Sequence, residues 1–117
     1  MSIDIFKNSA NTVEFSPGEV IFKEGEPGDV MYAVVDGSVD IVLGGQTIEK
    51  VEPGGIFGEL ALVDDSPRGA TAVAASAARV APVDKRHFTF LVQEHPTFAL
   101  QVMSVMAARL RQADQRS

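Results

Sequence analysis

Residues 57–72 read FGELALVDDSPRGATA: a Gly-Glu pair, a short apolar run, an acidic loop and a single arginine, Arg68. Gly58 lets the backbone approach a ligand closely because it has no side chain. Residues 59–62 are enough for one short helical turn, whose first N–H groups have no partner within the turn. Such N–H groups favour a phosphate, so this stretch indicates an anion site.

Glu59 and Arg68 bring opposite charges to this site. A guanidinium presents a planar fork of donors to phosphate oxygens, whereas a carboxylate only accepts hydrogen bonds. We therefore expect Glu59 to face a donor such as a sugar hydroxyl, with Arg68 balancing its charge. The alternative is an ordinary surface ion pair worth about 0–1 kcal/mol, beside a glycine that only turns the chain. Because Arg68 is expected on a loop, replacing it with Ala should leave the fold intact.

The run over residues 57–71 resembles the phosphate-binding cassette of cyclic nucleotide-binding domains. Those domains occur in cAMP-dependent protein kinase regulatory subunits, the bacterial catabolite activator protein and cyclic nucleotide-gated channels. The resemblance implies that Glu59 holds the ribose 2′-hydroxyl, that Arg68 holds the cyclic phosphate, and that backbone N–H groups help. The ligand-binding residues that it implies are Gly58, Glu59, Leu60, Ala61, Arg68, Gly69 and Ala70.

Gly69 is the one departure from the family's pattern within this run. The family commonly has Ala here, or a Ser or Thr whose hydroxyl reaches the ligand, and Thr there is associated with cGMP. Glycine offers no hydroxyl and adds backbone freedom to the loop. The resemblance therefore implies a cyclic mononucleotide ligand. We expect cAMP ahead of cGMP, with the base preference left open by Gly69.

Composition fits one globular domain over residues 1–117, because 45% of the residues are hydrophobic and 22% are charged. The net charge of −6, from 10 basic and 16 acidic residues, argues against a broad surface for nucleic acid or an anionic membrane. No apolar stretch reaches the roughly 18 residues of a membrane span, and residues 1–10 lack the basic start and apolar run of a secretory signal. The absence of cysteine is compatible with a reducing compartment. We expect a cytoplasmic chain that binds neither nucleic acid nor a membrane directly.

Short apolar runs separated by glycine and proline turns indicate a sandwich or barrel. The resemblance narrows this fold to mainly β with C-terminal helices: a jelly-roll-like β-roll over about residues 12–83, followed by two α-helices. Asp36-Gly37 between two apolar runs predicts a tight hairpin. A short helical turn is expected near the N-terminus, where Ile3 and Phe6 are spaced to share a face. The expected strands cover residues 12–15, 19–23, 30–35, 38–43, 46–51, 70–75 and 79–83.

The two helices are expected at about residues 84–94, with Asp84 as the N-cap, and 97–113. The second has an apolar face wide enough to cover the roll and still offer a surface to a partner. In the family the last helix often caps the base, and the candidates here are Met106, Arg109 and Leu110. The alternative is that the arginines at 109, 111 and 116 only complement the negative end of the helix dipole.

Catalysis has little support in the sequence. The two histidines, His87 and His95, lie beside the helical segments, and the expected strands contain none, which argues against a metal site. Nucleophile-elbow, P-loop and dinucleotide-binding motifs are absent. We expect no helix-turn-helix module after the last helix. We therefore expect a non-catalytic sensor without a cofactor or metal, which signals through its C-terminal helix to a second copy or an effector protein. The alternative is a nucleotide-independent dimerisation or interaction scaffold.

Overall fold

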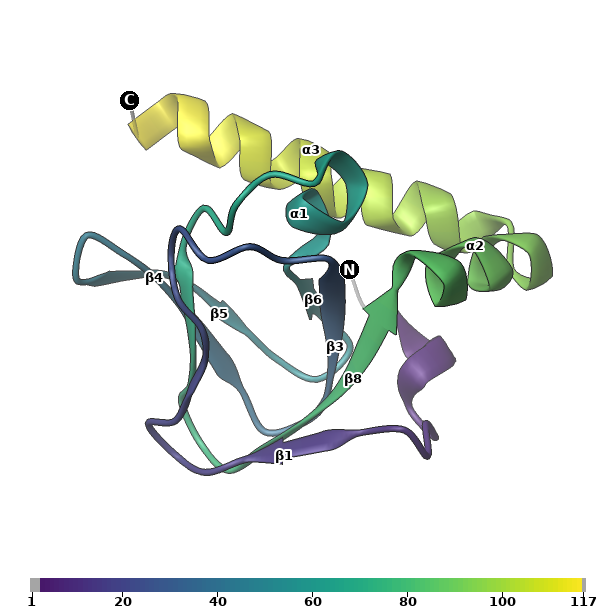
Figure 1. Cartoon of the computed structure of the whole chain (residues 1–117), viewed down its shortest axis with the longest axis horizontal. Coiled ribbons are helices and arrows are strands. Elements are labelled where there is room, and N and C mark those ends of the chain that lie inside the picture. The colour runs from purple at the N-terminus through teal and green to yellow at the C-terminus, as the bar shows by residue number, and fades with distance from the viewer. Residues whose placement is uncertain (1–2, 117) are drawn as a thin grey trace.

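The computed structural model describes residues 3–116 and contains two four-stranded antiparallel sheets that face each other (Figure 1). In spatial order, the first sheet holds β1 (Val13–Phe15), β8 (Ala78–Asp84), β3 (Val30–Asp36) and β6 (Ile56–Phe57). The second holds β2 (Val20–Phe22), β7 (Thr71–Ala74), β4 (Val39–Leu43) and β5 (Gln46–Val51). This arrangement confirms the expected β-roll. Residues 1, 2 and 117 of the expected domain lie outside the described part of the chain.

The chain turns at Asp36-Gly37 as expected, but the predicted hairpin is wrong, because β3 and β4 lie in different sheets and β4 pairs with β5 and β7 instead. Gly37 has a φ of 77°, in the left-handed region that favours glycine. A Cβ at this position would also clash with the backbone carbonyl of Ala77. Glycine is therefore required both for its backbone conformation and for its size.

Apolar side chains fill the space between the two sheets. Val34 of the first sheet packs there with Val39 and Ala72 of the second. β3 is buried on both faces, because Met31 and Ala33 belong to a different apolar cluster, on the helical side of the first sheet. A continuous apolar run is the pattern that such a doubly buried strand requires.

Helical segments cover the outer face of the first sheet (Figure 1). They are a 3-10 turn η1 (Asp4–Phe6) and the helices α1 (Glu59–Asp64), α2 (Lys85–Glu94) and α3 (Thr97–Arg116). Phe98 of α3 is fully buried, and its ring centroid lies 5.8 Å from that of Phe6 and 5.4 Å from that of Phe88. This aromatic cluster fixes the first turns of α3 on the roll. The expected N-terminal turn is present as η1, with Ile3 and Phe6 buried.

The two C-terminal helices begin close to their predicted positions. The Asp84 side chain caps α2 by accepting a hydrogen bond from the backbone N–H of His87 at 2.8 Å, as expected. α3 ends at Arg116 rather than near residue 113, because its last residues include good helix formers and no glycine or proline. Within residues 3–116, no helix combines the length and the apolar character that crossing a membrane requires.

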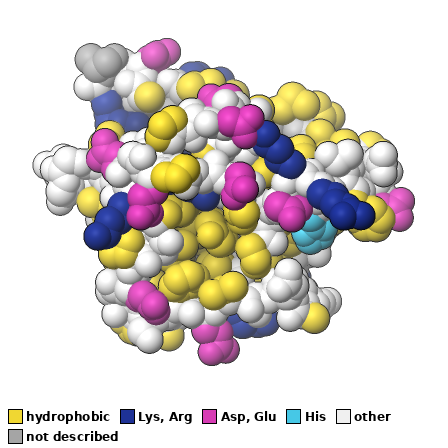
Figure 2. Space-filling view, viewed as in Figure 1, with side chains coloured by type: hydrophobic (Ala, Val, Ile, Leu, Met, Phe, Trp, Pro, Cys, Tyr) yellow, Lys and Arg dark blue, Asp and Glu magenta, His cyan; other side chains and the backbone are white. Residues whose placement is uncertain are grey.

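Figure 2 shows the face of the molecule seen in Figure 1, with hydrophobic side chains gathered near the centre and acidic side chains distributed around them. Basic side chains on this face are scattered among the acidic ones and form no continuous stripe. This distribution agrees with the net charge of −6.

Candidate functional site

Arg68 lies in the connection between α1 and β7 and is buried, with 6% of its surface exposed. Its Nη1 donates to the carbonyl of Gly58 at 3.1 Å, and its Nη2 donates to the carbonyl of Val30 at 2.7 Å. The guanidinium carbon lies 4.0 Å from the centroid of the Phe22 ring. The backbone N–H of Arg68 donates to the carbonyl of Glu26 at 2.8 Å. Arg68 lies on a loop, as expected, but several segments hold it, so we now expect its replacement to affect the fold.

Two glycines make room for this guanidinium. A Cβ at Gly28 would clash with Nε of Arg68, and a Cβ at Gly58 would lie 2.7 Å from Nη1. Nε itself is buried without a hydrogen-bond partner among the described residues. Burial lowers the pKa of Arg68, and nearby Tyr32 and acidic residues offset part of that shift. Arginine is effectively always protonated in proteins, so Arg68 brings a buried positive charge with an unused N–H to the site.

Glu59 opens α1 and is also buried, with 2% of its surface exposed. Gly58, the N-cap, has a φ of 79° and supplies no side chain to cap the first N–H groups of the helix. The carboxylate of Glu59 accepts a hydrogen bond from Nη1 of Arg109 on α3. The alternative of a surface ion pair between Glu59 and Arg68 is wrong, whereas the charge of Glu59 does act on Arg68 and offsets part of the lowering of its pKa by burial. Glu59 is buried and its contacting cation is Arg109.

Arg109 binds a second carboxylate, that of Glu49 on β5. Nε of Arg109 donates to Oε1 of Glu49 at 3.0 Å, and Nη2 donates to Oε2 at 2.8 Å. Nη2 also donates to the carbonyl of Ile56 at 2.7 Å. Burial alone would lower the pKa of Arg109, but the hydrogen bonds and charges of Glu49 and Glu59 outweigh it and raise that pKa. Arg109 therefore connects α3 to β5, β6 and α1 through one protonated side chain.

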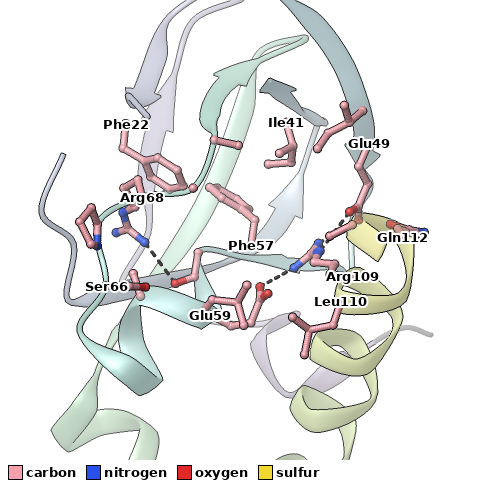
Figure 3. A pocket seen from close by; sticks show the side chains of 18 of the residues that line it. Phe22, Ile41, Glu49, Phe57, Glu59, Ser66, Arg68, Arg109, Leu110 and Gln112 are labelled. Atoms are coloured by element: carbon pink, nitrogen blue, oxygen red, sulfur yellow. Dashed lines mark hydrogen bonds and ion pairs between the residues drawn. The ribbon is translucent and has the colours of Figure 1, made fainter. Parts of the chain in front are cut away.

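These groups surround a cavity of about 230 Å³ (Figure 3). Arg68 lies beside Phe22 on one side, and Arg109 lies with Glu49 and Glu59 on the other. The apolar part of the wall includes Phe22, Ile41, Ile48, Phe57 and Leu110. The structure brings together all seven residues of the expected cassette, since the lining includes Gly58, Glu59, Leu60, Ala61, Arg68, Gly69 and Ala70.

The three base-cap candidates on α3 differ in position. Arg109 and Leu110 line the cavity, whereas Met106 does not and packs against the apolar cluster that contains Phe98. Met106 is turned toward the core because it lies on the buried side of α3. The interpretation of Arg109 as a cation that only complements the helix dipole is wrong, because its guanidinium contacts two carboxylates.

Glu49 and Phe22 contact the two arginines of the site but carry no sequence signal that identifies them. Glu49 lies in an alternating strand pattern, and its partner Arg109 is 60 residues further along the chain. Phe22 reads as an ordinary strand residue. The sequence signal that could have indicated the burial of Arg68 is the pair of glycines, Gly28 and Gly58, because they leave space for its side chain.

The described residues that line the cavity include no histidine, neither His87 nor His95. Within residues 3–116, no three His, Cys, Asp or Glu side chains are grouped so that they could hold a metal ion. The lining offers a ligand one buried cation, Arg68, one buried carboxylate, Glu59, and apolar walls.

Comparison with known proteins identifies a family of similar domains. The family model described as "Cyclic nucleotide-binding domain" matches residues 12–95. The Cyclic AMP receptor protein of Thermus thermophilus is 33% identical over 105 residues, which cover 86% of this chain and 49% of that protein. A cAMP-dependent protein kinase regulatory subunit of Hypocrea atroviridis is 36% identical over 85 residues, covering 73% of this chain and 18% of that protein.

The structural comparison agrees with the sequence comparison. The crystal structure of the Thermus thermophilus catabolite activator protein superimposes with a TM-score of 0.79 at 32% identity, covering 91% of this chain and 52% of that one. This chain spans about half of the two Thermus proteins and less than a fifth of the Hypocrea subunit.

Proposed function

This chain belongs to the cyclic nucleotide-binding domain family, and we propose that it is a non-catalytic sensor that binds a cyclic mononucleotide, cAMP in preference to cGMP. The observation that carries the proposal is the pair of buried charges, Arg68 and Glu59, on one cavity lined by all seven cassette residues. A cyclic nucleotide matches this pair, because it has an anionic phosphate at one end of the sugar and a hydroxyl donor on the ribose.

Arg68 is proposed to hold the cyclic phosphate. The Arg68 side chain donates to two neutral backbone carbonyls, those of Gly58 and Val30. Among the described residues, no carboxylate forms an ion pair with Arg68 that would neutralise its charge. Its buried Nε adds one unused donor. A charged donor within a buried pocket binds an anion more strongly than the same donor in water would. The backbone of the first turn of α1, with no side-chain cap, supplements it.

Glu59 is proposed to accept a hydrogen bond from the ribose 2′-hydroxyl. A carboxylate is an acceptor only, so it would repel a phosphate and favours the neutral, donating part of the ligand. Arg109 donates to Oε1 of this carboxylate and leaves its other oxygen free of Arg109. The opposite ends of the cavity thus favour opposite groups, which would fix the direction in which a nucleotide enters.

The base is proposed to contact the apolar part of the wall, which includes Ile41, Ile48 and Leu110. Gly69 lines the same cavity without a hydroxyl. A guanine that depends on a hydroxyl at this position would lose that hydrogen bond, whereas adenine would not. This difference supports cAMP as the preferred ligand.

The signal is proposed to leave through α3. Its side chains at 109 and 110 line the cavity, and its buried residues Phe98 and Val102 attach it to the roll. A ligand shifts the position of such a helix only by the difference in its affinity for the two positions, and typical couplings are about 1–3 kcal/mol. A helix that touches both the ligand site and the outer surface is placed to pass that difference to another protein.

Titration calorimetry with cAMP and with cGMP tests the proposal. We expect cAMP to bind with micromolar affinity or better, which corresponds to about −8 kcal/mol. Arg68→Lys should weaken it strongly, because an ammonium cannot reproduce the fork of a guanidinium. Arg79→Lys is the matched control, since Arg79 pairs with Asp36 on the surface and does not line the cavity. If a folded wild-type chain binds neither nucleotide, the proposed function is wrong.

A second function, contact with another copy of the chain, is favoured by an exposed apolar stripe on α3. Leu100, Met103 and Leu110 are each more than half exposed and recur at helical spacing. A dimer that forms to the same extent with and without cAMP, in a chain that binds no nucleotide, would support the scaffold alternative. Sedimentation velocity at several protein concentrations, with and without cAMP, distinguishes the two functions.

A further inference from the structure

Glu49, Arg109 and Glu59 form a chain of charged side chains that runs from β5 through α3 to α1. We propose that Glu49 is a positioning residue of the ligand site, which acts through Arg109 to orient the carboxylate of Glu59 toward the ribose hydroxyl. This inference rests on the proposed function, because it assigns Glu49 a part in recognising the same ligand.

The hydrogen bonds indicate which carboxylate holds Arg109 in place. Glu49 accepts from Nε and from Nη2 of Arg109, one N–H for each carboxylate oxygen, whereas Glu59 accepts from Nη1. A two-point contact fixes the plane of a guanidinium, and a single contact does not. The carbonyl of Ile56 further restrains Nη2. Nη1 is therefore presented to Glu59 in a direction that Glu49 determines.

Removing this two-point contact would change how Arg109 meets Glu59. Without Glu49, the planar fork of Arg109 is free to turn and pair with both oxygens of Glu59. A carboxylate engaged in that way has fewer lone pairs left to accept from a ribose hydroxyl. Glu49 therefore keeps Glu59 available to the ligand by holding most of the guanidinium itself.

The charges also support this role. Two carboxylates share the Arg109 guanidinium at this side of the cavity, while Arg68 contacts only carbonyls on the other side. Glu49 is one of these two carboxylates and is only partly buried, with 31% of its side chain exposed. An anionic phosphate is directed toward Arg68 and a hydroxyl donor toward Glu59.

The experiment compares two probes, cAMP and 2′-deoxy-cAMP, in titration calorimetry on the wild type and on Glu49→Gln. The wild type should prefer cAMP by about tenfold or more, because the deoxy probe lacks a hydrogen bond to a charged acceptor. In Glu49→Gln we expect that preference to fall to about threefold or less, mainly because the affinity for cAMP decreases while the affinity for 2′-deoxy-cAMP changes little. Asp40→Asn is the matched control, since Asp40 is paired with Lys50 on the same sheet and does not line the cavity.

The possible outcomes separate the two proposals. If the wild type binds neither probe, the proposed function fails, and the role of Glu49 toward a ligand fails with it. If Glu49→Gln keeps the wild-type preference, or loses affinity for both probes equally, the inference about Glu49 alone is overturned. In an Arg109→Gln background, checked for helix content by circular dichroism, Glu49→Gln should have no further effect on the preference. An equal effect in both backgrounds would show that Glu49 does not act through Arg109.

Discussion

Replacing Arg68 with Ala is expected to destabilise the fold itself, in the absence of any nucleotide, by about 2–4 kcal/mol. The substitution removes the two charge-assisted hydrogen bonds to the carbonyls of Gly58 and Val30, each worth about 1.5–3 kcal/mol. It also removes the contact between the guanidinium and Phe22, worth about 0.5–2 kcal/mol. The cost of burying the charge, which lowers the pKa of Arg68, disappears as well and offsets part of these losses.

Urea unfolding followed by far-ultraviolet circular dichroism measures this difference, provided that the slope of the transition is the same in both proteins. Arg79→Ala is the matched control, because Arg79 also pairs through its guanidinium but on the surface, with Asp36. Exposed pairs of that kind contribute about 0–1 kcal/mol. The free energy of unfolding should therefore fall clearly further in Arg68→Ala than in Arg79→Ala.

Equal midpoints for the two variants would refute this reasoning. The carbonyl contacts of Arg68 would then contribute nothing to the fold, and the original expectation of an indifferent loop would hold. The result also bears on binding experiments. A loss of nucleotide affinity in Arg68→Ala is interpretable only if the unfolding curve shows that the variant is folded under the conditions of the binding experiment.

Three further substitutions test separate features. Gly58→Ala should lower the free energy of unfolding by about 1–3 kcal/mol, because φ is 79° and the new Cβ would lie 2.7 Å from Nη1 of Arg68; an unchanged urea midpoint would contradict this. Gly69→Ser should leave stability within about 0.5 kcal/mol, since a Cβ there has open space, and should raise the cGMP affinity relative to cAMP by about twofold to tenfold in calorimetry; an unaltered ratio would mean that the hydroxyl does not reach the ligand. Asp84→Ala should cost about 1 kcal/mol by removing the cap on the His87 N–H, and thermal unfolding with no shift in midpoint would exclude that role.

Most strand and helix positions could be predicted because they depend on local sequence, but β6 was missed, since its two residues are too few to show an alternating pattern. The Asp36-Gly37 pair requires a turn whatever surrounds it, and Asp84 caps α2 through a residue three positions away. The wide apolar face of α3 predicted contact with the roll for the same reason. The end of α3 was predicted too early, because its polar residues 111–116 form helix without any apolar periodicity to mark them.

The side chains of the site were predicted, but their partners were not. Glu59 and Arg68 could be identified from the cassette, yet Glu59 contacts Arg109, which lies 50 residues away in the chain. Nothing in the local sequence distinguishes an arginine that binds a distant carboxylate from one at the end of a solvated helix. Glu49 is the clearest case, since its role depends wholly on where the fold places α3 relative to β5.

The aromatic contact between Phe6 and Phe98, together with the pairing of β1 and β8, has a consequence for folding kinetics. Both contacts join the first elements of the chain to the last ones, so neither forms until most of the chain is available. Long-range pairing of this kind slows folding relative to helical proteins of similar size. During synthesis, η1 and β1 emerge from the ribosome long before their partners and keep their apolar side chains exposed to water. We therefore expect the nascent chain to remain open to chaperones until β8 and the start of α3 have emerged.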